Sequence, residues 1–288
     1  MLTQDQLTAI ESARRAAGGF LPADVVATIV GGFEVGQLML DLIPLAKTFA
    51  IPPISNFFVG VVALGTSGNL YFGANYEFIG QALSFSVHGE QAATVQALSF
   101  GETGLEMLAI SAAPCGYCRQ FLNELTTASR LKIILPNMPA TLLSSLLPAA
   151  FGPADLGVTG GLMSPQSHGM TLPSPADDVA QAALNAANAS YAPYSVSYAG
   201  VALQTSDGGI YTGSIAENAA FNPSMSPLEA ALVSLIISGG RKYIDIVDAV
   251  LVEAAAPKAG QAGVTRDVLS TITKVPLRIY EASLASLA

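Results

Sequence analysis

The chain has 288 residues, of which 51% are hydrophobic and only 11% charged, so it can build a sizeable core and shows little sign of disorder. Its 12 basic and 21 acidic side chains give a net charge of −9, which disfavours binding to nucleic acid, because that binding rests on Lys and Arg. Without an apolar run of about 20 residues or a basic-then-apolar N-terminal signal, the sequence predicts a cytoplasmic protein with a small, weakly charged partner and no membrane contact.

Helices and strands alternate through the first half of the chain. Residues 1–48 carry apolar side chains at helical spacing and are predicted to be a helical segment that serves packing or dimerisation. The stretches 56–65 and 69–76 predict a β-hairpin joined by the turn TSG. The next predicted elements are a helix, a buried strand, a second helix and a further strand: 87–100, 106–113, 115–128 and 131–136. This order is typical of a layered α/β domain.

The second half of the sequence repeats the first. A segment rich in Gly, Pro and Ser, predicted to be a linker, spans 153–182. After it, APYSVSYAGVALQTSDGGIYTGSIAEN can be laid over PPISNFFVGVVALGTSGNLYFGANYEF without a gap. Eight positions are identical in the two stretches: Pro53/Pro193, Ser55/Ser195, Gly60/Gly200, Val61/Val201, Gly68/Gly208, Tyr71/Tyr211, Gly73/Gly213 and Glu77/Glu217. The sequence therefore predicts one domain over 49–152 and a second copy of it over 183–288.

The only two cysteines, Cys115 and Cys118, lie three residues apart in PCGYC, where a strand should give way to a helix. Residues i and i+3 of a first helical turn face the same side, so both sulfurs can reach one metal ion. In a cytosolic chain this spacing favours metal or redox chemistry over a structural disulfide. A zinc shell needs a further ligand. Of the two histidines, His88 begins a predicted helix in the same domain, whereas His168 lies in the predicted linker.

Glu90 follows His88 by two residues. At a helix start, H-x-E can direct the imidazole to a metal and place the carboxylate beside the open fourth position, where it can take a proton from a zinc-bound water. Three other interpretations stay open. The cysteines can be a thioredoxin-like redox pair, they can form a closed structural zinc site that recruits His168, or His88 can be an ordinary core residue.

The full pattern, H-x-E followed by P-C-x-x-C, is typical of zinc deaminases. With it, the segments SNFFVG, GNLYFGANYEF, VHGEQAA, PCGYCRQFLNEL, LLPAAFGPADL and GSIAENAAFNPSMSPLEAAL follow the order found in the cytidine deaminase family, and residues 50–288 resemble its larger, two-domain, homodimeric bacterial type. The resemblance implies a three-layer α/β/α domain duplicated in tandem. It also implies hydrolytic deamination of cytidine and 2′-deoxycytidine to uridine and 2′-deoxyuridine, with release of ammonia, in pyrimidine salvage.

Individual roles follow from the same resemblance. One Zn²⁺ per chain would be bound by His88, Cys115 and Cys118, and Glu90 would shuttle protons. The implied substrate-binding residues are Phe57, Asn75, Tyr76, Glu77, Gly89 and Phe151. Among them, Asn75 and Glu77 would hydrogen-bond the ribose 3′-hydroxyl, and Phe57 would pack on the pyrimidine. Phe151 would enter the site of the neighbouring subunit, which implies a homodimer with shared active sites.

The second copy lacks this chemistry. It contains no cysteine, Pro227 occupies the position of His88 if a shift of one residue is allowed, and Ile215 occupies that of Asn75. Glu217 and Glu229 remain there without a metal to serve. The second copy is therefore predicted to be catalytically silent and to serve packing and dimer formation.

Three alternative functions stay open at this point. The first is a deaminase of the same fold that acts on a polynucleotide, against which the acidic balance argues. The second is a deaminase of another small base or nucleoside. The third is a non-catalytic zinc protein that senses pyrimidines, which would have no need of Glu90.

Overall fold

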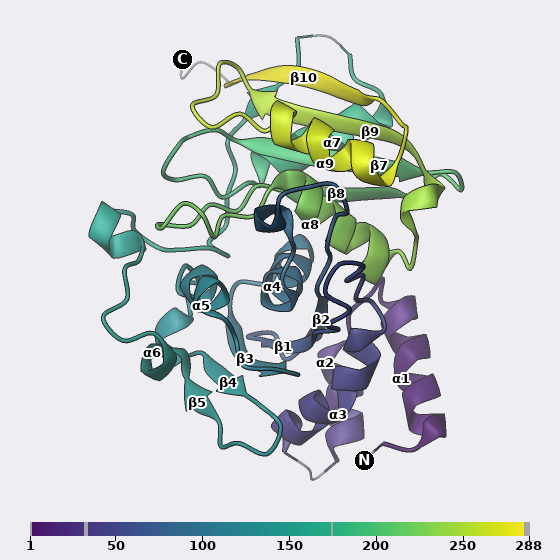
Figure 1. Cartoon of the computed structure of the whole chain (residues 1–288), viewed down its shortest axis with the longest axis vertical. Coiled ribbons are helices and arrows are strands. Elements are labelled where there is room, and N and C mark those ends of the chain that lie inside the picture. The colour runs from purple at the N-terminus through teal and green to yellow at the C-terminus, as the bar shows by residue number, and fades with distance from the viewer. Residues whose placement is uncertain (1, 32–33, 174, 285–288) are drawn as a thin grey trace.

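Two five-stranded sheets, one in each half of the chain, organise the structure, a computed structural model that describes residues 2–31, 34–173 and 175–284 (Figure 1). The first sheet has the strand order β2-β1-β3-β4-β5 and consists of β1 Gly60–Gly65, β2 Leu70–Ala74, β3 Leu105–Ile110, β4 Lys132–Ile134 and β5 Thr141–Leu142. The second has the order β6-β10-β9-β7-β8 and consists of β6 Met170–Thr171, β7 Ala199–Thr205, β8 Ile210–Ser214, β9 Ile246–Ala254 and β10 Leu277–Leu284.

Nine α-helices are assigned within the described residues: α1 Gln4–Ala16, α2 Ala23–Val30, α3 Val35–Lys47, α4 Gly89–Ser99, α5 Gly116–Leu122, α6 Leu143–Leu146, α7 Asp178–Asn188, α8 Pro227–Val233 and α9 Ala262–Ile272. We call β1–β5 with α3–α6 the first unit, and β6–β10 with α7–α9 the second unit. In this part of the chain no single helix has the length and apolar character to cross a membrane; only the pair α2 and α3, bent by 108°, passes that test on length and composition.

The two sheets share one pairing scheme. The predicted hairpin is confirmed, because β1 and β2 pair antiparallel from Gly60–Ala74 to Leu64–Leu70. Strand β3 pairs antiparallel with the other edge of β1, and β4 pairs parallel with β3. In the second unit, β7, β8, β9 and β10 repeat these three relations. The duplication predicted from the sequence is therefore present as a duplicated fold.

A helix before the first strand belongs to each unit. Helix α3 packs on β1 and β3, and α7 packs in the same way on β7 and β9. The contact is close enough to require glycine: a Cβ at Gly60 would lie 2.7 Å from the carbonyl oxygen of Ile43, and one at Gly200 would lie 2.5 Å from that of Ala183. Both pairs have the spacing of the sequence repeat, so the repeat extends back into α3. The described part of the segment 1–48 contains the helices α1, α2 and α3, and α3 forms one layer of the first unit.

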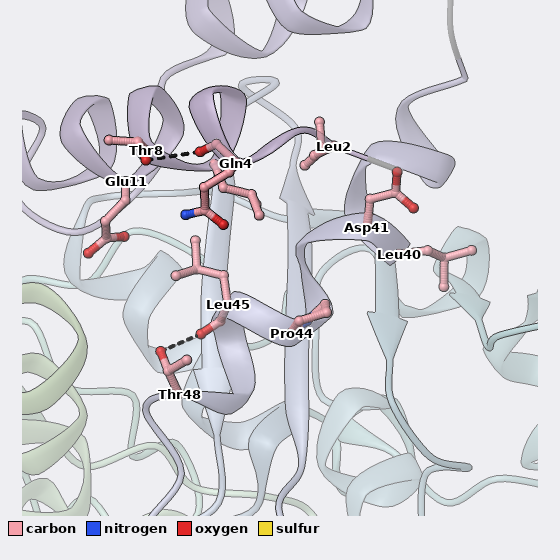
Figure 2. Close-up of a pocket in the computed structure, with 10 residues that line it drawn as sticks. Leu2, Gln4, Thr8, Glu11, Leu40, Asp41, Pro44, Leu45 and Thr48 are labelled. Atoms are coloured by element: carbon pink, nitrogen blue, oxygen red, sulfur yellow. Dashed lines mark hydrogen bonds between the residues drawn. The ribbon is translucent and has the colours of Figure 1, made fainter.

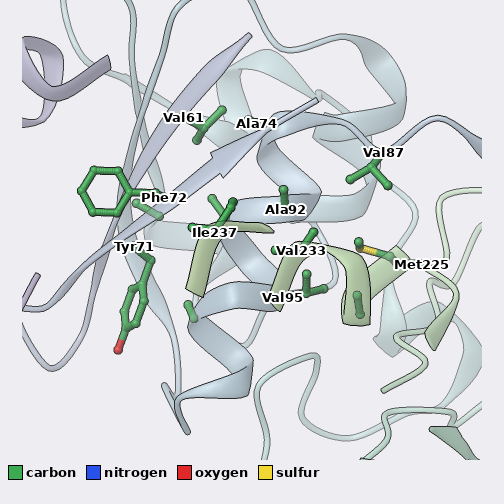
Figure 3. Packing of buried hydrophobic residues seen from close by; sticks show 14 of the residues in the cluster. Val61, Tyr71, Phe72, Ala74, Val87, Ala92, Val95, Met225, Val233 and Ile237 are labelled. Atoms are coloured by element: carbon green, nitrogen blue, oxygen red, sulfur yellow. The ribbon is translucent and has the colours of Figure 1, made fainter. Parts of the chain in front are cut away.

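Helix α4 lies between the first sheet and the second unit (Figure 1). One side packs on β1 and β2, and the other contacts α8. Every residue from Gly89 to Ala97 is buried. Figure 3 shows the resulting core, in which Ala92 and Val95 of α4 lie among Val61 and Phe72 of the first sheet and side chains of the second unit; those labelled from the second unit are Met225, Val233 and Ile237. One continuous apolar cluster therefore joins the two units around this helix.

Two predicted elements differ from the structure. The helix predicted over 115–128 ends at Leu122, because the chain beyond it forms backbone hydrogen bonds with Leu162. The Thr126 N–H donates to the Leu162 carbonyl at 3.1 Å, and the Leu162 N–H donates to the Glu124 carbonyl at 2.7 Å. The segment 153–182, predicted to be a linker, contributes β6 and the first turn of α7 to the second unit. In both places hydrogen bonds to distant parts of the chain produce a structure that the local sequence does not indicate.

Candidate metal centre

The three predicted zinc ligands meet at the starts of two helices. His88 is the N-cap residue of α4, and Cys115 is the N-cap residue of α5. Strand β3 ends at Ile110, and the short connection after it brings the PCGYC stretch to the start of α5. Arg119 fixes this connection, because its guanidinium donates to the carbonyl oxygen of Pro114 at 2.9 Å.

The ligand atoms have the spacing of a tetrahedral zinc shell. The Nδ1 atom of His88 lies 3.6 Å from the Cys115 sulfur and 3.2 Å from the Cys118 sulfur, and the two sulfurs are 3.5 Å apart. Zn–S bonds of about 2.3 Å and Zn–N bonds of about 2.0–2.1 Å at tetrahedral angles would separate these atoms by about 3.5–3.8 Å. Two thiolates and one imidazole therefore fit the ion closely and leave its fourth position to another ligand.

The two thiols are electrostatically coupled. The hydrogen bond between the sulfurs lowers the pKa of Cys115 to about 5, and it acts against a smaller effect of burial. The same bond, together with burial, raises the pKa of Cys118. Both sulfurs bind a divalent ion as thiolates, so metal binding would release the protons that the thiols carry.

Glu90 is positioned beside this group. Its side chain is only 4% exposed, and burial raises the pKa of its carboxyl, while hydrogen bonds from its own backbone N–H and from Cys118 act in the opposite direction. A carboxyl with a raised pKa next to an open metal position suits proton transfer near neutral pH. The structure therefore brings Glu90 together with His88 and Cys118, as the H-x-E spacing predicts.

Asn75 and Glu77 border the segment that carries Phe57. The Asn75 amide oxygen accepts from the Val59 N–H at 2.8 Å, and its NH₂ donates to the Phe57 carbonyl at 2.8 Å. The Glu77 carboxylate accepts from the Ser55 hydroxyl at 2.5 Å and from its N–H at 2.9 Å. These bonds, against an opposing effect of burial, lower the pKa of Glu77. Both side chains thus order the loop that presents the Phe57 ring, which is 58% exposed.

Three further residues of the predicted substrate-binding set have different surroundings. Gly89 begins α4 where a Cβ would lie 2.8 Å from a methyl carbon of Val61, so a larger residue there would displace the Val61 side chain. Phe151 is 44% exposed, and its carbonyl accepts from the side chains of Gln120 and Asn123. Tyr76 is fully buried, and its hydroxyl is one of those without a hydrogen-bond partner among the described residues. The structure therefore does not bring the Tyr76 ring to the surface of the site, because the ring belongs to the core.

His168 lies outside the ligand cluster. Its ring stacks on Tyr198 with a centroid distance of 3.5 Å, and its Nε2 is 2.7 Å from the carbonyl oxygen of Ser190. In the part of the chain that the structure describes, the one group of three or more His, Cys, Asp and Glu side chains that could hold a metal is His88, Cys115 and Cys118. A closed zinc site that recruits His168 is therefore not formed.

The start of α8 shows how the second unit differs from the first. A Cβ at Gly73 would lie 2.1 Å from the carbonyl oxygen of Gly89, and a Cβ at Gly213 would lie 2.4 Å from that of Pro227. Pro227 is therefore the counterpart of Gly89. The offset between the copies, 140 residues from Gly73 to Gly213, falls to 138 at the helix start because the loop before α8 is two residues shorter.

The alignment of Pro227 with His88 is consequently wrong. The first residues of the two helices correspond in order: His88, Gly89, Glu90 and Gln91 in the first unit, and Ser226, Pro227, Leu228 and Glu229 in the second. Ser226 stands at the place of the imidazole and forms a capping box with Glu229. A continuous overlay of the sequences could not reveal this, because the two-residue deletion falls in a loop without recognisable periodicity.

A cavity of about 670 Å³ lies elsewhere, between α1 and α3 (Figure 2). Leucine side chains form much of its wall, including Leu2, Leu40 and Leu45. The Glu11 carboxylate at its edge is engaged by Arg14 and Arg15 at 2.7 Å each. None of the candidate catalytic residues lines this cavity, so it is separate from the metal centre.

Comparison with known proteins agrees with this site. The family described as "Cytidine and deoxycytidylate deaminase zinc-binding region" matches residues 34–134, and a second form with the same description matches residues 143–266. Cytidine deaminase of Aeromonas hydrophila is 49% identical over 262 residues, which is 90% of this chain and 88% of that protein. Cytidine deaminases of Shewanella loihica and Yersinia pestis are 46% and 48% identical over 90% and 88% of this chain, and over 88% and 86% of their own lengths.

The fold and the His-Cys-Cys group define a zinc-binding deaminase with a duplicated domain. At this identity and coverage, the chain belongs to the cytidine deaminase family. Crystal structures of cytidine deaminases from Mycobacterium tuberculosis and Burkholderia pseudomallei also match, at 32% and 27% identity. Each match covers 40% of this chain. It includes 96% of the M. tuberculosis chain and 98% of the B. pseudomallei chain, with TM-scores of 0.38 and 0.36.

Proposed function

We propose that this protein hydrolyses cytidine and 2′-deoxycytidine to uridine and 2′-deoxyuridine with release of ammonia, as an enzyme of pyrimidine salvage in the cytoplasm. The observation that supports this most strongly is the convergence of His88 Nδ1 and both cysteine sulfurs beside the buried carboxyl of Glu90. These residues would hold Zn²⁺. When bound, the ion would lower the pKa of a water, so that hydroxide is available near neutral pH to attack a carbon that carries an amino group.

Glu90 performs the proton transfers in this proposal. Its carboxylate accepts one proton from the attacking water and delivers it to N3 of the cytosine ring. It then takes the second proton from the same oxygen and gives it to the amino group, which leaves as ammonia when the C–N bond breaks and the carbonyl forms. One water is consumed and one ammonia leaves, so the reaction needs no further reactant. Glu90 is 4% exposed, and this burial raises the pKa of its carboxyl for this task.

The loop 54–59 would hold the nucleoside. Phe57 offers an exposed ring for the pyrimidine, and Asn75 and Glu77 lie at the base of the same loop. Each Glu77 oxygen already accepts hydrogen bonds, yet a carboxylate has about four acceptor positions, which leaves room for a ribose hydroxyl. Contacts to the sugar, remote from the reacting carbon, would fix the approach of the ring.

We further propose that the protein works as a homodimer whose active sites are shared. Gln120 and Asn123 hold the carbonyl of Phe151, and its ring stays 44% exposed. A ring fixed outward in this way suits insertion into a neighbouring subunit. We also place the start of the first repeat at α3, in place of the boundary at residue 49, because α3 packs as α7 does.

The fall in ultraviolet absorbance when cytidine is added to the purified protein tests the reaction, and a zinc analysis of the same sample tests the cofactor. We expect turnover with one zinc per chain. Binding of cytidine without turnover would favour the pyrimidine sensor, and a salt-dependent shift of labelled RNA would favour a polynucleotide deaminase.

Mixing two inactive variants tests the shared sites. Chains with Glu90→Gln and chains with Phe151→Ala, unfolded and refolded together, would form some heterodimers in which one site has both residues intact. We expect activity above that of either variant alone. A fully active monomer, or heterodimers without any gain, would make Phe151 an ordinary exposed side chain.

A further inference from the structure

The interdomain loop, residues 218–223 of the second unit, lies against the metal centre of the first. It forms hydrogen bonds to both helices that carry the ligands. The side-chain NH₂ of Gln91, on α4, donates to the carbonyl oxygen of Pro223 at 3.1 Å. The hydroxyl of Tyr117, on α5, donates to the carbonyl oxygen of Asn222 at 2.8 Å. Neither the zinc motif nor the repeat assigns a role to these two side chains.

Gln91 connects the loop to His88 directly. Its amide oxygen accepts from the backbone N–H of His88 at 3.2 Å, while its NH₂ reaches Pro223. The side chain is 3% exposed, so neither bond can be replaced easily by water. A single residue thus joins the main chain of a metal ligand to the second unit.

Tyr117 connects the loop to the imidazole of His88 from the opposite helix. It stands between the two cysteines in the sequence, and its ring lies 5.3 Å from the His88 ring, measured between centroids, at an angle of 34°. The hydroxyl bond to Asn222 fixes this ring from its far end. Because that bond is exposed, it should contribute less than the more buried bonds of Gln91.

The loop itself is held firmly enough to serve as an anchor. The N–H of Ala219 donates to the buried carboxylate of Glu124 at 2.9 Å, and the Asn218 side chain donates to the carbonyl of Gln120 at 2.9 Å. Inside the loop, Phe221 has the left-handed backbone angle φ 61°, which its neighbours must maintain. The loop is thus bound to the first unit at further points besides its hydrogen bonds to Gln91 and Tyr117.

We propose that the metal-free second unit is part of the support of the zinc centre: its interdomain loop positions His88 through Gln91 and Tyr117. Outer partners of metal ligands orient those ligands and hold the metal more tightly. Here the outer partners are themselves oriented by a domain that contributes no ligand. This inference rests on the proposed zinc site. Gln91 and Tyr117 are positioning residues, because they act through His88.

Two matched pairs of variants test the proposal on the full chain. Gln91→Met is compared with Gln96→Met, because Gln96 is buried on the same helix and also makes two hydrogen bonds, to Phe72 N and Gly19 O. Tyr117→Phe is compared with Tyr71→Phe, because Tyr71 also donates a hydroxyl hydrogen bond, to Glu102 within the first unit. Each control removes a side-chain hydrogen bond that leads neither to a zinc ligand nor to the interdomain loop.

Two readouts without nucleoside are used: the rate of zinc release to a chromogenic chelator, below the unfolding temperature of every variant, and the visible spectrum of the cobalt-substituted protein. We expect zinc release to accelerate about 10- to 100-fold in Gln91→Met and about 2- to 5-fold in Tyr117→Phe. Both changes should shift the cobalt bands. Gln96→Met and Tyr71→Phe should lower the unfolding temperature, but they should leave the release rate and the spectrum as in the unaltered protein.

Equal release rates and spectra within each matched pair would overturn the proposal and reduce the loop to an ordinary contact between domains. If Gln91→Met fails to fold, the Tyr117 pair decides the matter alone. A chain that holds zinc but does not deaminate cytidine would overturn the proposed function, whereas the release rates would still decide the role of the loop.

Discussion

The starts of α4 and α8 are the same structural position used in two ways. In the first unit the N-cap residue is His88, whose ring is directed to two cysteines, and Gln91 covers the backbone N–H of the cap. In the second unit Ser226 and Glu229 form a reciprocal capping box. The second arrangement satisfies the helix end, as stable helices prefer. At the start of α4 the His88 side chain makes no capping hydrogen bond, which leaves the imidazole free to bind a metal.

The largest expected effect is the loss of the metal. Cys118→Ala should reduce zinc from one per chain to nearly none and abolish deamination, because two ligands with open positions hold zinc poorly. Elemental analysis of the purified variant measures this directly. His168→Ala is the control: its ring is stacked on Tyr198, away from the cluster, and zinc should stay in place. Full zinc content in Cys118→Ala would refute the assignment of the ligands.

Glu90→Gln should preserve zinc and nucleoside binding while turnover falls. General acid–base groups typically contribute about 10²–10⁴-fold, and the loss should lie near the upper end because one carboxyl serves several transfers. The comparison is Glu229→Gln, whose carboxyl has no metal beside it. Initial rates at saturating cytidine check both. A loss of less than tenfold in Glu90→Gln would remove this residue from the mechanism.

The stability of the second unit should depend on pH through Glu229. Burial raises the pKa of Glu229 to about 7, against hydrogen bonds from Ser226 that lower it. Because the folded-state pKa lies above the unfolded one, its contribution to stability is complete below about pH 4.5 and is lost as pH rises through 7. Glu229→Gln should therefore stabilise the protein by about 3 kcal/mol at pH 8 and by almost nothing at pH 4.

Denaturant unfolding of the two proteins at both pH values measures this difference. The glutamine can still accept from the Ser226 N–H, so the helix cap is retained. A stability difference that does not change with pH would show that Glu229 is not the titrating group.

The smallest expected effect concerns the cap itself. Ser226→Ala removes the acceptor for the Glu229 N–H and should lower the free energy of unfolding by about 1 kcal/mol. Ser270→Ala, at an exposed helix position, is the matched control and should change it by less than about 0.5 kcal/mol. Urea unfolding monitored by circular dichroism resolves the two. If both variants unfold alike, the capping box at α8 contributes nothing measurable.

The sequence predicts the zinc centre well because its signals are local. Cys115 and Cys118 share one helical turn, and His88 and Glu90 share another, so their spacing already defines which groups point together. The hairpin is equally local, since the glycine-containing turn joins two strands that pair directly. The third ligand follows because His88 is the only histidine in the first domain.

The contacts between the units could not be predicted in this way. Gln91 and Pro223 are 132 residues apart, and Tyr117 and Asn222 are 105 residues apart, so periodicity carries no information about either pair. Gln91 and Tyr117 look like ordinary polar positions near a helix start. The one available signal is the buried polar face of α4: a glutamine on a helix flanked by apolar residues needs a distant partner.

The burial of α4 on all sides has a consequence for how the protein unfolds. Its backbone amides from Gly89 to Ala97 are covered by the first sheet on one side and by the second unit on the other. A local opening at the edge of one unit therefore does not expose these amides to solvent. Their hydrogens should therefore exchange with deuterium only when the whole molecule opens, and the two halves should melt in one cooperative transition. A shortened chain that ends before the second unit would expose the apolar side of this helix and aggregate.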